Sequence, residues 1–216
     1  MEFQGRIIGI LFSFINSSAW AFYGYYTFGV FYTKVFIFFL LLFTFLFWQA
    51  GRLYDEAKFH SEKDSLTNTY NRRFIYKKFS KFIAKCNKCS AYIIDIDNFK
   101  QINDIYGHLI GDKVICAVSS VLLNQINKSD ILARWGGDEF LLLSSHIQTK
   151  EEFEFNVQKN MKIISKQMGF EINVSIGCST YPYEGLSLEE LIKVADNNMY
   201  SNKASKQLPQ EMLTNT

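Results

Sequence analysis

The pattern of apolar and polar positions divides the chain into two parts. No charged residue occurs in the 27 positions from Ile7 to Thr33, and a second uncharged run covers the 17 positions from Val35 to Gly51. A helix that crosses a membrane needs about 20 apolar residues, within a range of about 17–25. The pattern therefore predicts two transmembrane helices, over about residues 7–26 and 35–51, and a membrane anchor formed by residues 1–51.

The rest of the chain shows the mixed periodicities of an α+β domain. Gly136-Gly137 separates two short apolar runs and predicts a β-hairpin. The order of strands and helices is that of a ferredoxin-like β-α-β-β-α-β core, for which we expect the helices on one face of the sheet. Residues 207–216, which include Pro209, are expected to form a flexible tail. The expected helices cover about residues 66–85, 98–106, 111–126, 149–168 and 187–205, and the expected strands about residues 92–97, 130–135, 139–145 and 172–180.

Composition sharpens the division between the two parts. The chain carries 23 Lys and Arg against 21 Asp and Glu, a net charge of +2. This is not the basic excess of a nucleic-acid-binding protein, so no nucleic-acid partner is expected. Disorder, a collagen helix and a disulfide scaffold are excluded by composition. Residues 1–51 hold 12 of the 21 Phe but only three of the charged side chains, those of Glu2, Arg6 and Lys34.

Basic residues orient the two expected spans. The outer ends of the pair are flanked by Arg6, Arg52, Lys58 and Lys63. Cytoplasmic ends of spans are typically the basic ones. We therefore expect a multi-pass protein of the bacterial inner (cytoplasmic) membrane, with residues 52–63 as a helical linker to a cytoplasmic domain. Two alternatives stay open: Ala19-Trp20-Ala21 after an apolar run resembles a signal-peptide cleavage site, and the two runs could form a buried hairpin of a soluble protein.

Four cysteines, Cys86, Cys89, Cys116 and Cys178, lie in the second part. They are typical of reduced, buried thiols in a cytosolic domain. Cys86 and Cys89 have the spacing of a zinc half-site, but no second Cys or His pair follows at the spacing that such sites need.

Carboxylates mark two places in the second part. Asp95 and Asp97 end an expected strand, where alternation puts both side chains on one face, and oxygen ligands of this kind suit Mg²⁺. Asp138 and Glu139 follow the two glycines of the expected hairpin. Taken singly, one acid could cap the next helix and the hairpin could be a solvated turn. Together, acids on adjacent strands could hold two divalent metals for nucleotidyl transfer.

Five ordered motifs in residues 64–206 resemble the GGDEF-type diguanylate cyclases, which have a nucleotidyl-cyclase-type fold. The longest runs from Asp95 to His108, with Gly111-Asp112 after it, and Arg134-Trp-Gly-Gly-Asp-Glu-Phe140 carries the hairpin. The others are Asp64-Ser-Leu-Thr67 with Asn71-Arg-Arg73, Val174-Ser-Ile-Gly177, and Ala195-Asp196 with Met199-Tyr200 and Lys203.

The resemblance implies that two GTP molecules condense into cyclic di-GMP with release of two pyrophosphates. Each domain of a homodimer would hold one GTP, with Mg²⁺ or Mn²⁺ as cofactor. Asp95 through its side chain and Ile96 through its carbonyl would bind metal. Asp138 would be both a metal ligand and the acceptor of the ribose 3′-hydroxyl proton, and Glu139 would add negative charge beside the metals.

The resemblance also implies a set of substrate contacts. Asn103 and Asp112 match the positions that read guanine, and an amide and a carboxylate can pair with its O6, N1–H and N2–H₂. His108 matches a substrate-contact position. Phe99 and Lys100 match the loop that approaches the phosphates, and Lys203 matches a phosphate-binding lysine.

Four positions depart from the family pattern. Lys206-Gln207 replaces the usual Gly-Arg after the phosphate-binding lysine, so weaker GTP binding is expected, because Lys and Gln lack the guanidinium fork. Asn127 replaces the Arg of an inhibitory Arg-x-x-Asp product site that would end at Asp130, so no product inhibition by that route is expected. Asn68 stands where Gly is usual. A silent GTP- or partner-binding regulator, a structural membrane adaptor and a cyclase with a mononucleotide product are the alternative functions.

Overall fold

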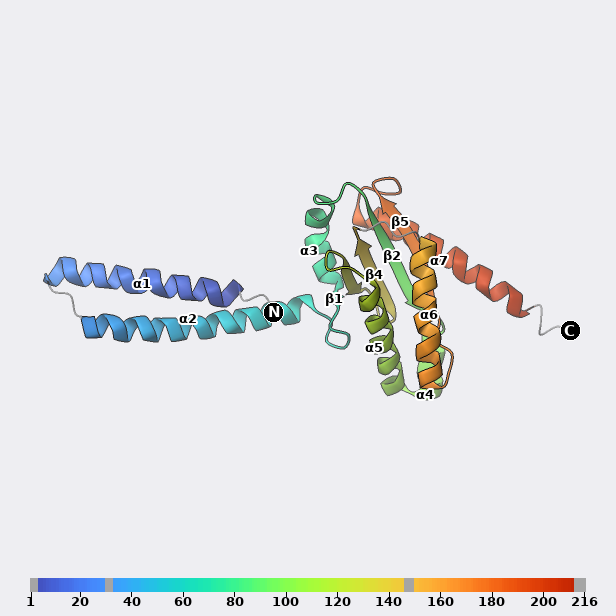
Figure 1. Ribbon diagram of the computed structural model, residues 1–216, viewed down its shortest axis with the longest axis horizontal. Coiled ribbons are helices and arrows are strands. Elements are labelled where there is room, and N and C mark those ends of the chain that lie inside the picture. The colour runs from blue at the N-terminus through green and yellow to red at the C-terminus, as the bar shows by residue number, and fades with distance from the viewer. Residues whose placement is uncertain (1–3, 30–32, 146–149, 212–216) are drawn as a thin grey trace. The chain divides into compact units, whose positions relative to one another are not determined.

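The computed structural model describes residues 4–29, 33–145 and 150–211, with the main chain alone for residues 59, 60, 202 and 204–211. It consists of two compact units, Met1–Glu62 and Lys63–Thr216, which we describe separately. Figure 1 shows a helical hairpin in the first unit and a sheet with helices in the second.

The first unit is built from two long helices. α1 covers Gln4–Phe28 and α2 covers Thr33–Glu62. Both have segments long and apolar enough to cross a membrane, by length and composition. The two predicted spans lie inside these helices. α2 continues without a break through the expected boundary at residue 51, so the predicted linker forms one helix with the second span.

Small residues bring α1 and α2 together. Gly5, Gly9, Ser13 and Ser17 recur every four residues and form the buried stripe of α1. Close packing of this kind is typical of helices that associate through small side chains. Polar groups fix the pairing, since the Ser13 and Thr44 hydroxyl oxygens lie 2.8 Å apart. The Asp55 carboxylate accepts a 2.8 Å hydrogen bond from the Gly5 main-chain N–H, which caps the start of α1.

The second unit contains a five-stranded sheet with strand order β1-β3-β4-β2-β5. β1 pairs parallel with β3, and the remaining pairs are antiparallel. The ferredoxin-like core is confirmed, because β2, β3, β4 and β5 follow the expected β-α-β-β-α-β order. The elements are β1 Tyr70–Asn71, α3 Arg72–Ile83, β2 Cys89–Ile96, α4 Phe99–Tyr106, α5 His108–Gln125, β3 Ile131–Arg134, β4 Glu139–Ser144, α6 Lys150–Met168, β5 Val174–Tyr181 and α7 Leu188–Glu211.

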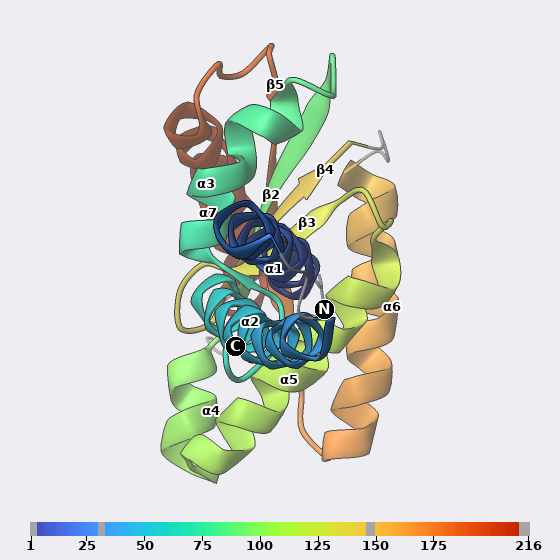
Figure 2. The same ribbon diagram turned by 90° about the vertical axis from the view of Figure 1, so that its left-hand side faces the viewer.

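Helices cover both faces of this sheet: the helices of the ferredoxin-like core, α5 and α6, lie on one face as expected, and the flanking helices α3 and α7 cover the other. One core joins alternate strand residues to α5 and α6, for example Ile94 with Val118 and Val157. A second core joins the other strand residues to α3 and α7, for example Ile93 with Ile75. Figure 2 shows α3 and α7 on one side of the strands and α5 and α6 on the other. The reason lies in β2, which is apolar on both faces and must be covered on both.

The segment before α3 also differs from expectation. The predicted helix over 66–85 begins only at Arg72, because residues 64–69 form a turn. The Asp64 carboxylate accepts the Thr67 N–H at 2.9 Å, and Asn68 adopts a left-handed φ of 59°. Asn tolerates this conformation better than other non-glycine residues, so it can replace the usual Gly. Asn71 then caps α3 by accepting the Phe74 N–H.

The last helix is longer than expected. α7 continues to Glu211, past the end near residue 205 that Pro209 led us to predict. Proline lacks a main-chain donor and its ring crowds the carbonyl four residues earlier, which is why an earlier end was expected. The end of the predicted tail, residues 212–216, lies outside the described residues.

Candidate active site

Strand pairing brings the predicted acids together. Asp95 on β2 lies directly opposite Glu139 on β4, and the Ile96 N–H donates to the Asp138 carbonyl at 3.2 Å. Because β2 and β4 are central strands, their backbone is fixed by neighbours on both sides. The four predicted metal-site residues thus meet at one end of two adjacent strands.

The hairpin tip is held in a defined shape. The Glu139 carbonyl accepts hydrogen bonds from Trp135 N–H at 2.8 Å and Gly136 N–H at 3.2 Å. A Cβ atom at Gly136 would lie 2.7 Å from the Glu139 Oε2 atom, so a side chain there would displace the carboxylate. Gly136 therefore leaves room for the Glu139 carboxylate in its observed position.

Arg134 is a site-supporting residue to which the sequence analysis gave no role. Its guanidinium donates to the Gly137 carbonyl at 2.6 Å and 3.1 Å, and to the Asp64 carboxylate at 3.2 Å. Arg134 therefore ties the tip of the hairpin to the turn at the start of the unit. Arg134 and Asp64 occur in two of the quoted motifs, but only the fold shows that they are partners.

The acids create an excess of negative charge. Burial raises the pKa of the Asp95 carboxyl; the Lys203 ammonium opposes this rise, and Asp138 and Asp97 add to it. Burial also raises the pKa of Glu139, and Asp95 is the next cause. The pKa of Asp196, for which no role was predicted, is raised by partial desolvation and by Asp95. A cation bound here would stabilise the ionised carboxylates.

Lys203 supplies positive charge at this site. Its Nζ atom lies 2.5 Å from Asp95 Oδ1 and 3.7 Å from Asp97 Oδ1. Burial lowers the pKa of Lys203, but the two carboxylates raise it by more, so the net direction is upward. Asp97 also accepts a 2.7 Å hydrogen bond from the Ser175 hydroxyl. Asp95 and Asp97 both face Lys203, in agreement with the expected alternation along the strand.

The donor set fits a hard divalent cation. Carboxylate and carbonyl oxygens are the ligands that Mg²⁺ and Mn²⁺ prefer. Burial raises the pKa of Asp95 and Glu139, and a bound cation would favour the ionised form of both carboxyl groups. Among residues 4–29, 33–145 and 150–211, no three His, Cys, Asp or Glu side chains converge as a metal cage. The acids are therefore adjacent without forming a closed metal site, and the cysteines of the zinc alternative are free.

The predicted guanine contacts lie on two consecutive helices. Asn103 is on α4, Asp112 is on α5, and Gly107 joins the helices with a φ of 82°. A Cβ atom at Gly111 would overlap the Asn103 Oδ1 atom, so the Asn103 amide lies against α5 at the position before Asp112. Gly111 is thus a further residue on which this site depends. Gly111 occurs in a quoted motif, but its role is visible only from the close approach of the two helices.

The other predicted substrate contacts differ in their exposure. His108 is exposed at the first position of α5, and Lys100 is exposed in the first turn of α4. The Phe99 side chain packs against the core on the α5 side of the sheet. The packing of the Phe99 ring therefore fixes the start of α4, where its main-chain groups lie. The side chains of Lys206 and Gln207 lie outside the described side chains.

Asp130, the last residue of the motif that lacks its arginine, has a structural role. The Asp130 carboxylate accepts the Asn127 N–H at 2.9 Å and the Ser145 N–H at 3.1 Å. These bonds close the turn before β3 and tie it to the end of β4. Asp130 therefore has local partners without an arginine at position 127.

Comparison with known proteins agrees with this arrangement. A family model described as diguanylate cyclase, GGDEF domain, matches residues 61–208. Diguanylate cyclase DosC of Escherichia coli strain K12 is 32% identical over 162 residues, which are 70% of this chain and 35% of DosC. YtrP of Bacillus subtilis, described as uncharacterized, is 34% identical over 160 residues, which are 71% of this chain and 26% of YtrP. The chain thus corresponds to about a third or less of the length of these relatives.

Solved structures share the fold of the second unit. The GGDEF domain of TpbB (YfiN) from Pseudomonas aeruginosa matches with a TM-score of 0.60 at 30% identity, over 66% of this chain and 89% of that one. The coiled coil and GGDEF domain of DgcB from Caulobacter crescentus, in complex with c-di-GMP, matches with a TM-score of 0.63 at 24% identity, over 73% of this chain and 88% of that one. With a family model that covers most of its length, the chain belongs to the GGDEF family of diguanylate cyclase domains.

Proposed function

We propose that the protein is an active diguanylate cyclase, which joins two GTP molecules into cyclic di-GMP and releases two pyrophosphates. The observation that carries the proposal is the pairing of Asp95 with Glu139 across β2 and β4, beside Asp138. Both strands are paired on each side, so the two carboxylates are held in a fixed relation, which supports the proposal. The name of DosC, a diguanylate cyclase, and the c-di-GMP bound in the structure of DgcB support the same conclusion.

The bond changes assign a role to each acid. The ribose 3′-oxygen of one GTP attacks the α-phosphorus of the other, and the bond from that phosphorus to pyrophosphate breaks. Asp138 accepts the hydroxyl proton. Mg²⁺ or Mn²⁺ held by Asp95, the Ile96 carbonyl, Asp138 and Glu139 would lower the pKa of the hydroxyl and stabilise charge on the leaving group. The same exchange at the second ribose closes the ring.

Two groups of residues would recognise the substrate, one for guanine and one for the phosphates. Asn103 and Asp112 bind the guanine edge, and the exposed His108 contacts the same nucleotide. The main chain at Phe99, together with Lys100, approaches the phosphates at the start of α4, where free N–H groups favour anions. Lys203 exchanges its contact with Asp95 for the triphosphate when GTP binds.

Catalysis requires two copies of the chain, because each domain holds one GTP and the product contains two. We propose that α1 and α2 insert into the cytoplasmic membrane with the second unit in the cytoplasm, and that the helices favour pairing. The apolar character of both helices supports insertion, and the basic residues at their outer ends support this orientation.

Substitution Asp138→Asn tests the role of the acid in the full chain. The change keeps size and main-chain bonds, so we expect folding and GTP binding to persist while product formation falls by at least about 100-fold. Asp104→Asn, at an exposed position on α4, is the matched control and should retain activity. GTP binding without product in the parent protein would contradict the proposal and favour the regulatory module, for which Gln207 is the sequence argument.

A further inference from the structure

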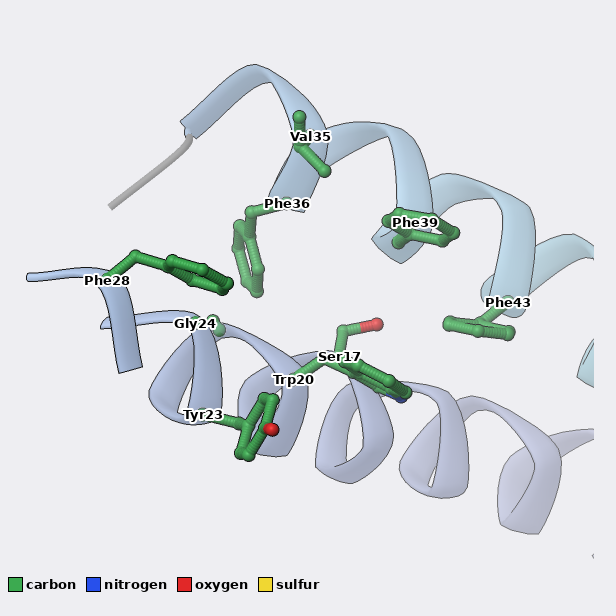
Figure 3. Close-up of a pocket in the computed structure, with 10 residues that line it drawn as sticks. Ser17, Trp20, Tyr23, Gly24, Phe28, Val35, Phe36, Phe39 and Phe43 are labelled. Carbon is green, nitrogen blue, oxygen red and sulfur yellow. The ribbon is translucent and has the colours of Figure 1, made fainter. Parts of the chain in front are cut away.

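A cavity lies between α1 and α2, near the end where the two helices are connected. Its volume is about 330 Å³, and its walls include Trp20 and Gly24 of α1 and Phe36, Phe39 and Phe43 of α2. Figure 3 shows the Phe36 and Phe43 rings on the side of α2 that faces α1, and the Trp20 ring beside Ser17 on α1. The small-residue stripe runs from Gly5 toward this end of the hairpin, and its last member, Ser17, lines the cavity.

One polar group in this wall stands out. Ser17 is 1% exposed, lines the cavity, and its hydroxyl has no hydrogen-bond partner among the described residues. Figure 3 shows this hydroxyl in the space between α1 and α2. Ser13, one turn earlier on the same stripe, has Thr44 as its partner. A buried hydroxyl without a partner is unfavourable in an apolar setting, so the wall around Ser17 is incomplete without a ligand atom that pairs with it.

The size and chemistry of the cavity define its occupant. Its volume lies at the lower end of the range of about 300–1,000 Å³ for small-molecule pockets. A helix of a second copy, about 10 Å across, is too large to enter. A lipid acyl chain has no group that can pair with the hydroxyl. Aromatic walls and one hydroxyl instead suit a flat, apolar molecule that carries a carbonyl oxygen.

We propose that the helical hairpin binds a lipophilic carbonyl compound between Trp20 and the α2 phenylalanines, with its oxygen hydrogen-bonded to Ser17. This site goes beyond the proposed cyclase activity and does not depend on it. It gives the anchor a chemical input that α1 and α2 can sense, because the ligand contacts both helices at once. Binding is therefore tested directly, without an assay of product.

The probe is menadione, a flat apolar quinone that quenches tryptophan fluorescence. The full chain with Trp48→Phe and Trp135→Phe, in phosphatidylcholine vesicles, leaves Trp20 as the reporter in the cavity wall. We expect saturable quenching with about one menadione per chain. Ser17→Ala should weaken binding by about 2- to 10-fold, the effect of one hydrogen bond. Ser18→Ala, at the exposed neighbouring position, should leave binding unchanged.

A second variant fills the cavity. A Cβ atom at Gly24 has no other atom within 4 Å, so a larger side chain fits there without a clash. Gly24→Leu should abolish the saturable part of the quenching, while Ala19→Leu, at an exposed position outside the cavity wall, should not. Linear quenching that is equal in the parent and Gly24→Leu would overturn the proposal and indicate lipid chains in this space. If the Trp20 fluorescence changes with the protein-to-lipid ratio and not with the menadione concentration, the proposal is overturned. Such a result would indicate that a second copy of the chain occupies this space.

Discussion

Gln207 follows Lys203 by four residues on α7, so both positions lie on one face of the helix. Lys203 contacts the acids of the site, and we expect an arginine introduced one turn later to reach the phosphates that Lys203 is proposed to bind. Because Arg binds phosphate through two parallel hydrogen bonds, Gln207→Arg should lower the KM for GTP by about 10-fold with kcat unchanged. Ser201→Arg adds the same charge on another face and should leave KM unchanged. An unaltered KM in both variants would show that position 207 does not reach the substrate.

Gly111 has a predicted effect on substrate choice. An added methyl group would overlap Asn103 Oδ1 and push the amide away from α5. We expect Gly111→Ala to raise the KM for GTP by about 10-fold and to reduce discrimination against ATP, although alanine favours the helix. Lys113→Ala, on the exposed side of the same helix, serves as the control. Steady-state rates with both nucleotides check this, and normal selectivity would exclude Asn103 from guanine recognition.

At the scale of elements, the Asp64–Arg134 contact joins the first turn of the second unit to the β3–β4 hairpin. Burial acts to raise the pKa of Asp64, but hydrogen bonds from Thr67 and the charge of Arg134 lower it below its ordinary 3.8. Because the folded-state pKa is lowered, this carboxylate stabilises the fold above pH 3.8, and the stabilisation is lost as pH falls through the folded value.

Asp64→Asn should therefore destabilise the protein by about 1 kcal/mol at pH 7, with a difference from the parent that shrinks below pH 3.8. Urea unfolding of the parent and the variant at several pH values measures this difference. A difference that is constant with pH would mean that packing, rather than the charge of Asp64, links these elements.

The sequence predicted the elements that have their own periodicity. The apolar runs of β2, β4 and β5 and the Gly136-Gly137 turn identified the sheet and hairpin. The start of α3 was misjudged because Leu66 and Thr67 fit a helical pattern, whereas the turn depends on Asp64 and on Asn68 at positive φ. β1 has two residues and gains its identity only by pairing with β3, which no local pattern records.

The site shows the same division between local and tertiary information. The acids of the site and their spacing could be read from the motifs, because residues that neighbour each other on strands keep a fixed relation. The roles of Arg134 and Gly111 could not be read from the motifs, although both residues occur in them. Their roles come from the approach of segments that are separate in the sequence. Close approach is decided by packing and is visible only in the folded chain.

At the scale of the whole molecule, the anchor should raise the activity of the catalytic unit. The proposed reaction needs two GTP-loaded domains to meet, and confinement to a membrane would raise their effective concentration. We expect residues 52–216 alone to lose specific activity on dilution, while the full chain in vesicles keeps it at the same protein concentration. Rates measured over a dilution series check this. A fragment as active as the full chain at every dilution would show that the helices do not favour pairing.

The central claim is that this chain makes cyclic di-GMP. The most direct test is to incubate the full chain in membranes with GTP and Mg²⁺, and to identify the products by chromatography and mass. The account predicts cyclic di-GMP and pyrophosphate in a ratio of one to two, both absent with Asp138→Asn. GTP that is bound but unchanged, or a mononucleotide cyclic product, would contradict the account.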